Sequence, residues 1–118
     1  MSKIAFTIFV FGLYLVGLGI VLLVVPNLWL GIFQIPATHD IWIRILGMLL
    51  FYLGIYYILA ARKEMTDFFR WTVYLRSTVI LFLITFVLLG FGKPIIILIG
   101  IIDFMGAVWT WLALRVSK

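Results

Sequence analysis

The chain alternates between four long apolar runs and short polar segments, and the runs fill most of its 118 residues. Each run is close to the ~20 residues that an α-helix needs to cross ~30 Å of hydrocarbon. The pattern therefore predicts an all-α, polytopic membrane protein that forms an antiparallel four-helix bundle. We expect the spanning helices at about residues 4–25, 41–61, 69–91 and 95–114.

Residues typical of helix ends support these bounds. Pro26 stops the first run, and Asp40 stands where it can cap the second helix. Thr66 or Asp67 can cap the third helix, and Pro94 suits the first turn of the fourth. The first run is too long for a cleavable signal peptide, and no small-x-small cleavage site follows it.

The three connections predict which helices are neighbours. Residues 90–94 read Gly-Phe-Gly-Lys-Pro, a tight turn that makes the third and fourth helices adjacent. The charged link at 62–68 is short, so we expect the second and third helices to be adjacent too. The apolar segment 26–40 is longer, and we expect it to lie in the outer membrane interface as a short helix or lid.

Composition supports lipid as the solvent, because 67% of the residues are hydrophobic and 11% are charged, against roughly 25% charged in soluble domains. The length fits one domain over residues 1–118. The lack of cysteine excludes thiol–disulfide oxidoreductases, cysteine nucleophiles and iron–sulfur ligation. A single histidine, His39, excludes a bis-histidine haem within one copy. We expect no metal site, no cofactor and no catalytic residue.

Lysine and arginine residues are divided unevenly between the two membrane sides that four spans create. Seven lie on the side of the termini and the 62–68 link, and two lie on the other side. Positive charge is retained in the cytoplasm, so both termini are predicted to be cytoplasmic. The net charge of +5 therefore reflects orientation and not nucleic-acid binding. The seven are Lys3, Arg62, Lys63, Arg70, Arg76, Arg115 and Lys118; the two are Arg44 and Lys93.

Large aromatic residues agree with two membrane interfaces. Tryptophans cluster near the predicted helix ends, where aromatic belts anchor spanning helices. In the outer segment 26–40, we expect Trp29 and Phe33 to insert at the interface and to roof the bundle. The outer interface residues are Trp29, Phe33 and Trp42; the inner ones are Trp71, Trp109 and Trp111.

Asp103 is the one carboxylate inside the apolar runs. It follows Pro94 by nine residues, which places it about 13 Å deep at 1.5 Å per residue. Insertion of a carboxylate near the middle of the membrane costs about 2.5–3.5 kcal/mol on insertion scales. Such a residue is therefore expected either to pair with another group or to have a function. Its helix face is rich in small residues, which predicts that it faces protein and not lipid. That face contains Ile96, Ile99, Gly100, Gly106, Ala107 and Thr110.

Two arginines are candidate partners for Asp103, each separated from it by about 8 Å along the membrane normal. We rank Arg44 first because its helix face continues through Gly47 and Gly54, a small-residue seam that suits close packing. Arg76 is the rival, because its helix is the guaranteed neighbour. Both side chains could instead extend to lipid headgroups, as arginines near helix ends often do.

Tyrosines add to this candidate polar network. Tyr14 and Tyr52 are expected near mid-depth, and a buried tyrosine hydroxyl usually has a partner. Asp103, an arginine and a tyrosine then form either a structural network or the polar floor of a ligand or proton site. A further polar stripe on the third helix is expected to face solvent or lipid headgroups. It consists of Arg70, Tyr74 and Ser77.

Several features resemble the small DoxX-like four-helix membrane proteins: the Pro26 stop, the Arg44-x-x-Gly47 motif, Gly54, and the Asp103-x-x-Gly106-Ala107 motif. That group includes members associated with quinone-linked membrane oxidation. The resemblance implies a four-helix bundle and a lipophilic ligand, and it transfers no catalytic residue. The chain is similar in size to small multidrug transporters, but their key carboxylate lies in the first helix, where this chain has none.

Three functions remain open from the sequence. The leading one is a non-catalytic accessory subunit or a lipophilic-ligand-binding protein of the cell membrane. The alternatives are a proton-coupled small transporter that uses Asp103, and a membrane enzyme that acts on a lipid or quinone. The expected partners are the bilayer, a lipophilic small molecule, and further copies or subunits of a larger complex, with no nucleic acid.

Overall fold

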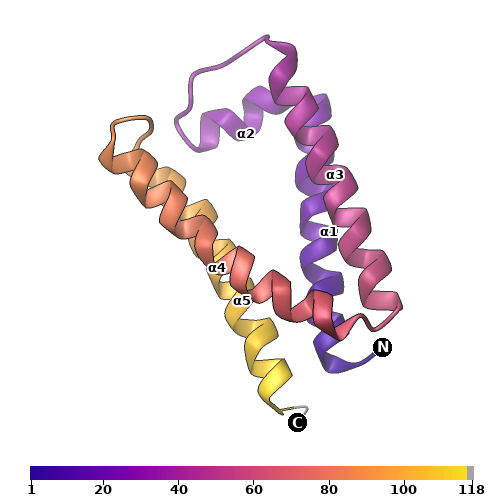
Figure 1. Cartoon of the computed structure of the whole chain (residues 1–118). Helices are drawn as coiled ribbons and strands as arrows, with labels where there is room; N and C mark the ends of the chain where they lie inside the picture. The colour runs from indigo at the N-terminus through magenta and orange to yellow at the C-terminus, as the bar shows by residue number, and fades with distance from the viewer. Residues whose placement is uncertain (117–118) are drawn as a thin grey trace.

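The structure, a computed structural model, describes residues 1–116 and consists there of helices and connecting turns (Figure 1). It confirms an all-helical chain in which four helices are long and apolar enough to cross a membrane. Ser117 and Lys118, the latter counted above among the basic residues, lie outside the described residues. The elements are α1 (Lys3–Val24), α2 (Pro26–Ile32), α3 (Ile41–Arg62), α4 (Thr66–Leu88), η1 (Pro94–Ile96) and α5 (Ile97–Val116).

Three helices end in the same hydrogen-bonded motif. At the end of α4, the Phe91 N–H donates to the Phe86 carbonyl at 2.8 Å, and the Gly90 N–H donates to the Val87 carbonyl at 3.1 Å. This is a Schellman arrangement, with Gly90 in the left-handed region at φ 82°. It ends α4 three residues before the predicted end, although the apolar run continues. The same bond pattern closes α2 at Gln34 and α3 at Glu64, both with positive φ.

The start of α4 also lies three residues before the predicted one. The turn at Glu64 leads directly into the helix, with Met65 at the N-cap position. Asp67 therefore lies in the first turn and pairs with Arg70 at 3.6 Å instead of capping the helix. Asp40 does stand at the N-cap of α3, but its side chain makes no capping hydrogen bond.

α1 and α3 pack backbone to backbone along four glycines. Gly12 faces Gly54, and Gly19 faces Gly47, so the two helices run antiparallel with glycines seven residues apart on each. A Cβ at any of the four would stand 2.6–2.9 Å from the other helix's backbone. Small residues permit this approach between membrane helices. The predicted seam of Gly47 and Gly54 is therefore used, and its partner is α1.

α4 and α5 form a second close pair. The turn after Gly90 reverses the chain, and Pro94 opens the 3-10 turn η1 that leads into α5. A Cβ on Gly100 of α5 would stand 2.7 Å from the Ile80 Cα of α4. Gly100 therefore allows these two helices to approach closely.

The segment between α1 and α3 contains the predicted short helix. In α2, Leu30 is 2% exposed and packs in one cluster with Leu22 of α1 and Ile43 of α3. Trp29 and Phe33 stack with ring centroids 4.7 Å apart, and Phe33 is buried. α2 thus packs beside the end of α1 that lies away from the termini and runs sideways from it (Figure 1).

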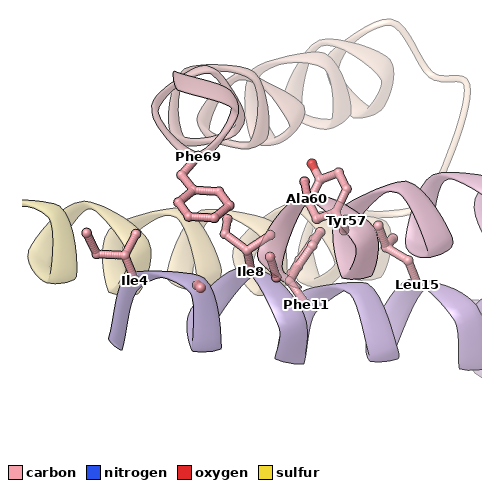
Figure 2. Close-up of a cluster of buried hydrophobic side chains, with 9 residues drawn as sticks. Ile4, Ile8, Phe11, Leu15, Tyr57, Ala60 and Phe69 are labelled. Atoms are coloured by element: carbon pink, nitrogen blue, oxygen red, sulfur yellow. The ribbon is translucent and has the colours of Figure 1, made fainter. Parts of the chain in front are cut away.

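The two helix pairs meet at the end that carries both termini and diverge toward the other end (Figure 1). At the meeting point, Phe69 of α4 points toward Ile4 and Ile8 of α1, within a buried apolar cluster (Figure 2). α1 is the helix that contacts both members of the other pair. α3 and α4 meet near their link, where the rings of Tyr57 and Phe68 lie 5.4 Å apart. The arrangement is two pairs joined at one end.

The glycine seam generates a direct test. We expect Gly19→Ala to lower stability by about 1–3 kcal/mol, because its new methyl group meets backbone atoms that cannot move aside. Gly17→Ala is the matched control, since nothing lies within 4 Å of its Cβ position on the same helix. Thermal unfolding in mild detergent measures both. Equal stability of the two variants would contradict the packing of α1 on α3.

Candidate functional site

Arg76 is buried where the two helix pairs meet, although it is a cation within a membrane-spanning helix. Its side chain is 3% exposed. It lies ten residues after Thr66, about 15 Å into α4 at 1.5 Å per residue. A charge at such depth is costly unless it is paired with other groups, so its contacts decide its role.

Two threonines, Thr72 of α4 and Thr110 of α5, accept most of the hydrogen bonds that the Arg76 guanidinium donates. Nε donates to the Thr72 carbonyl at 3.3 Å, and Nη2 donates to the Oγ1 atoms of Thr72 at 3.3 Å and Thr110 at 2.8 Å. Thr110 Oγ1 lies 2.8 Å from Thr7 Oγ1 of α1. Thr7 already donates its proton to the Ile4 carbonyl at 2.7 Å, so Thr110 is the donor to Thr7.

The resulting chain of hydrogen bonds runs from α4 through α5 to α1. Each hydroxyl in it has one proton and uses it: Thr110 toward Thr7, Thr7 toward the Ile4 carbonyl, and Thr72 toward the Phe69 carbonyl at 2.7 Å. Thr7 and Thr110 are both almost fully buried. Because these hydrogen bonds cross from α4 to α5 and from α5 to α1, the buried network joins the two helix pairs.

The outer edge of the guanidinium has a different environment. Its Cζ lies 4.6 Å from the centroid of the Phe11 ring, a cation–π contact that is strongest when water is excluded. Nη1 is buried and has no hydrogen-bond partner within residues 1–116. It stands 3.2 Å from the position that a Cβ on Gly106 would take. Gly106 therefore leaves room for the free N–H edge of Arg76.

Asp103 lies one helical turn beyond Gly106 on α5, on the side away from the termini. Three residues correspond to roughly 5 Å along the helix axis. Asp103 is partly buried and interacts electrostatically with Arg76, but the two form no ion pair within 4.0 Å. Within residues 1–116, its carboxylate accepts no hydrogen bond. Asp103 and the free edge of Arg76 thus lie in one region of the junction, with Gly106 beside Arg76 and Asp103 one turn away on the same helix.

Two tyrosines border this region. Both Tyr14 of α1 and Tyr57 of α3 interact electrostatically with Asp103. Their rings pack on Phe11, at centroid distances of 5.5 Å for Tyr14 and 5.6 Å for Tyr57. The site therefore has an aromatic wall on the α1–α3 side and polar groups on the α4–α5 side.

Two predicted members lie elsewhere. Arg44 is exposed and donates from Nη1 to the Leu23 carbonyl in the last turns of α1. It thus satisfies a helix-end carbonyl and stands away from Asp103. Tyr52 is 52% exposed on the outside of α3, with Phe51 as its ring neighbour. Of the two candidate arginines, the structure brings Arg76 and not Arg44 to Asp103.

The small-residue face of α5 and the aromatic belts are placed as follows. Ala107 and Gly100 are buried against the neighbouring helices, and Gly106 stands beside Arg76.

The interfacial tryptophans other than the half-buried Trp29 are 43–61% exposed, as expected of rings at a membrane boundary. These four are Trp42, Trp71, Trp109 and Trp111.

Sequence reasoning missed Phe11, Thr7 and Thr72. Thr72 had a usable signal, because it precedes Arg76 by four residues and shares its helix face. Phe11 and Thr7 had none, because only the crossing of α1 over the other pair brings them to the guanidinium.

A scan of protein-family models, a search of curated proteins and a search of solved structures give no match to this chain. The resemblance to small DoxX-like proteins therefore stays a prediction.

This geometry supports two different tasks. The Arg76 edge that faces the threonines is saturated with hydrogen bonds and holds helices together. The Asp103 carboxylate and the free Nη1 edge offer an acceptor and a donor to a third group. A hydroxyl, an amine or a water molecule is the kind of group that such a pair binds.

The coupling of Asp103 to its partner can be measured with two double-mutant cycles. We expect Asp103→Ala and Arg76→Ala to be non-additive by about 0.5–3 kcal/mol, because the two charges interact electrostatically. Asp103→Ala with Arg44→Ala is the matched cycle and is expected to be additive. Thermal unfolding in detergent gives the free energies. Coupling to Arg44 alone would contradict the placement of Asp103.

Proposed function

We propose that this chain is a small multi-pass protein of the cell membrane that binds a lipophilic molecule between its two helix pairs. The Asp103 carboxylate binds a hydroxyl or amine of that molecule, while the Arg76–threonine network holds the pairs together. The single observation that carries the proposal is the state of Asp103: partly buried, near a buried cation, and without a hydrogen bond or ion pair within residues 1–116.

The cost of an unpaired carboxylate supports a binding role. If Asp103 served structure alone, a direct ion pair with Arg76 would stabilise both groups better than their present separation. Arg76 instead donates its hydrogen bonds to Thr72 and Thr110. A carboxylate that is left free in an apolar setting is typical of an intramembrane functional site.

The surroundings indicate what the ligand is like. Phe11, Tyr14 and Tyr57 supply aromatic surface on the α1–α3 side. Binding sites are usually lined by apolar and aromatic groups, with a few polar groups that orient the ligand. The pairs diverge on the side of Asp103 that lies away from the termini (Figure 1). A lipid-soluble molecule with one polar group thus fits better than a water-soluble one.

An antiparallel four-helix bundle in the membrane and a higher oligomer are further parts of this proposal. Apolar side chains remain exposed on both pairs, including Leu75, Phe82 and Leu88 on α4, and lipid or another subunit is expected to cover them. The protein would act as an accessory subunit if its ligand were passed to such a partner.

Proton-coupled transport is the second candidate, because the same free carboxylate can take up and release a proton. The two candidates differ in what occupies the site. Transport requires water to reach Asp103 from both sides in turn, whereas ligand binding requires an apolar occupant.

Ligand binding is tested by purifying the protein in mild detergent and identifying its bound small molecules by native mass spectrometry. We expect a lipophilic molecule to accompany the wild type and to be lost with Asp103→Leu, because the carboxylate that binds its polar group is gone. Asp67→Asn, which changes an exposed carboxylate, is the matched control. Thermal unfolding checks that each variant is folded, and Asp103→Asn replaces Asp103→Leu if the latter is not.

Two outcomes would contradict the proposal. One is equal retention of the small molecule by the Asp103 variants. The other is Asp103-dependent proton flux in liposomes without any bound molecule, which would favour the transporter.

We further propose that both termini are cytoplasmic. Arg76 is buried among protein atoms, so it adds little to the basic surface, but six basic residues still oppose two. The chain has no cysteine, so single cysteines can be introduced directly. We expect Ser2→Cys to resist an impermeant thiol reagent in intact cells and Lys93→Cys to react with it. The reverse labelling pattern would show the opposite orientation.

A further inference from the structure

A groove runs along the α4–α5 pair, on the side of α5 that carries Phe104, Val108 and Trp111. Near the termini it is a hollow of about 110 Å³ lined on one wall by Arg70 and Tyr74 and on the other by Trp111 and Arg115. Farther into the membrane it continues as a hollow of about 280 Å³. The two share Val73, Tyr74 and Trp111, so they form one groove, called here the α4–α5 groove.

The chemistry of the α4–α5 groove changes along its length. Its mouth carries two guanidinium groups, from Arg70 and Arg115. Its deeper part is lined mainly by apolar side chains, with hydroxyl groups from Tyr74 near the mouth and from Ser77. The Ser77 hydroxyl donates to the Val73 carbonyl at 2.6 Å, so it is satisfied within its own helix. The groove therefore has a cationic mouth and an apolar interior.

The length of the groove matches one leaflet. On α5 the lining runs from Arg115 to Phe104, eleven residues or about 16 Å at 1.5 Å per residue. Half of a ~30 Å hydrocarbon core is about 15 Å. Trp111, at the mouth, is 45% exposed, as is usual for a tryptophan at the headgroup level.

Both cations at the mouth are available to an anion. The Arg115 guanidinium rests 5.0 Å from the Trp111 ring, which holds its position, and within residues 1–116 its N–H groups donate no hydrogen bond. Arg70 pairs with Asp67 at 3.6 Å, and both side chains are mostly exposed. Such a surface ion pair is weak, so a phosphate can replace Asp67 as the partner of Arg70. Arginine binds phosphate through two parallel hydrogen bonds, which suits a lipid headgroup.

We infer that the α4–α5 groove binds an anionic phospholipid of the leaflet on the side of the termini. The phosphate lies between Arg70 and Arg115, and an acyl chain lies along Val73, Ala107 and Val108. The apolar groove below the two cations is what favours a lipid over a soluble anion. The inference does not depend on the ligand proposed at Asp103.

The test measures binding of phosphatidylglycerol and of phosphatidylcholine with matched acyl chains to the detergent-solubilised protein by native mass spectrometry. We expect the wild type to prefer the anionic lipid. The double variant Arg70→Gln with Arg115→Gln is expected to bind it about 30-fold more weakly, because each surface cation contributes roughly fivefold. Arg62→Gln with Lys63→Gln is the matched control, since both residues are exposed on the same side but outside the groove.

A second variant and a competitor distinguish a lipid from a free phosphate. Ser77→Phe fills the apolar part, so we expect it to weaken binding of both lipids. Glycerol phosphate, which has the charge but no acyl chain, is expected not to compete. The inference is wrong if the Arg70 and Arg115 double variant keeps its preference, if the control loses as much, or if glycerol phosphate displaces the lipid. Asp103→Asn is expected to leave the lipid preference unchanged, which separates this result from the ligand proposed above.

Discussion

The arrangement of the helices depends on one buried cation. Arg76 of α4 donates to Thr110 of α5, and Thr110 donates to Thr7 of α1, so a single network joins the two helix pairs. In a membrane, apolar contacts between helices gain little over contacts with lipid, so close packing and hydrogen bonds decide which helices associate. Removal of the guanidinium would take away the hydrogen bonds that Thr72 and Thr110 accept from it, and with them the polar link between α4 and α5, a loss that the surrounding apolar contacts cannot replace.

A different kind of contact holds each helix pair together. α1 and α3 associate through four glycines that bring backbones together, whereas α4 and α5 combine a tight turn with the close approach at Gly100. The polar network lies near the end that carries the termini, and toward the other end the pairs diverge (Figure 1). Asp103 stands just beyond the network. Its position explains how the same chain has both a satisfied polar junction and a free carboxylate.

The two proposed sites lie on neighbouring faces of α5 and use opposite charges. Ala107, on the same face as Asp103, also lines the α4–α5 groove. Asp103 lies at the junction with α1 and α3, where the proposed ligand would bind between the two helix pairs. Arg115 faces the bilayer beside Arg70, where the occupant is a lipid. A lipid held in the α4–α5 groove would pack against the pair that carries Arg76 and Asp103.

The hydrophobic pattern by itself determined the four spanning helices, because lipid forces every backbone polar group into regular structure. It also placed Asp103 on a small-residue face of its helix. It misplaced both ends of α4, since the Schellman motifs at Glu64 and Gly90 depend on backbone conformation and not on hydropathy. The partner of Asp103 was decided by tertiary structure alone. Gly47 and Gly54 pack on α1, which directs Arg44 to the end of α1, and only the crossing of α1 brings Thr7 and Phe11 to Arg76. Such crossings depend on how whole helices fit together, which the spacing of residues within one helix does not specify.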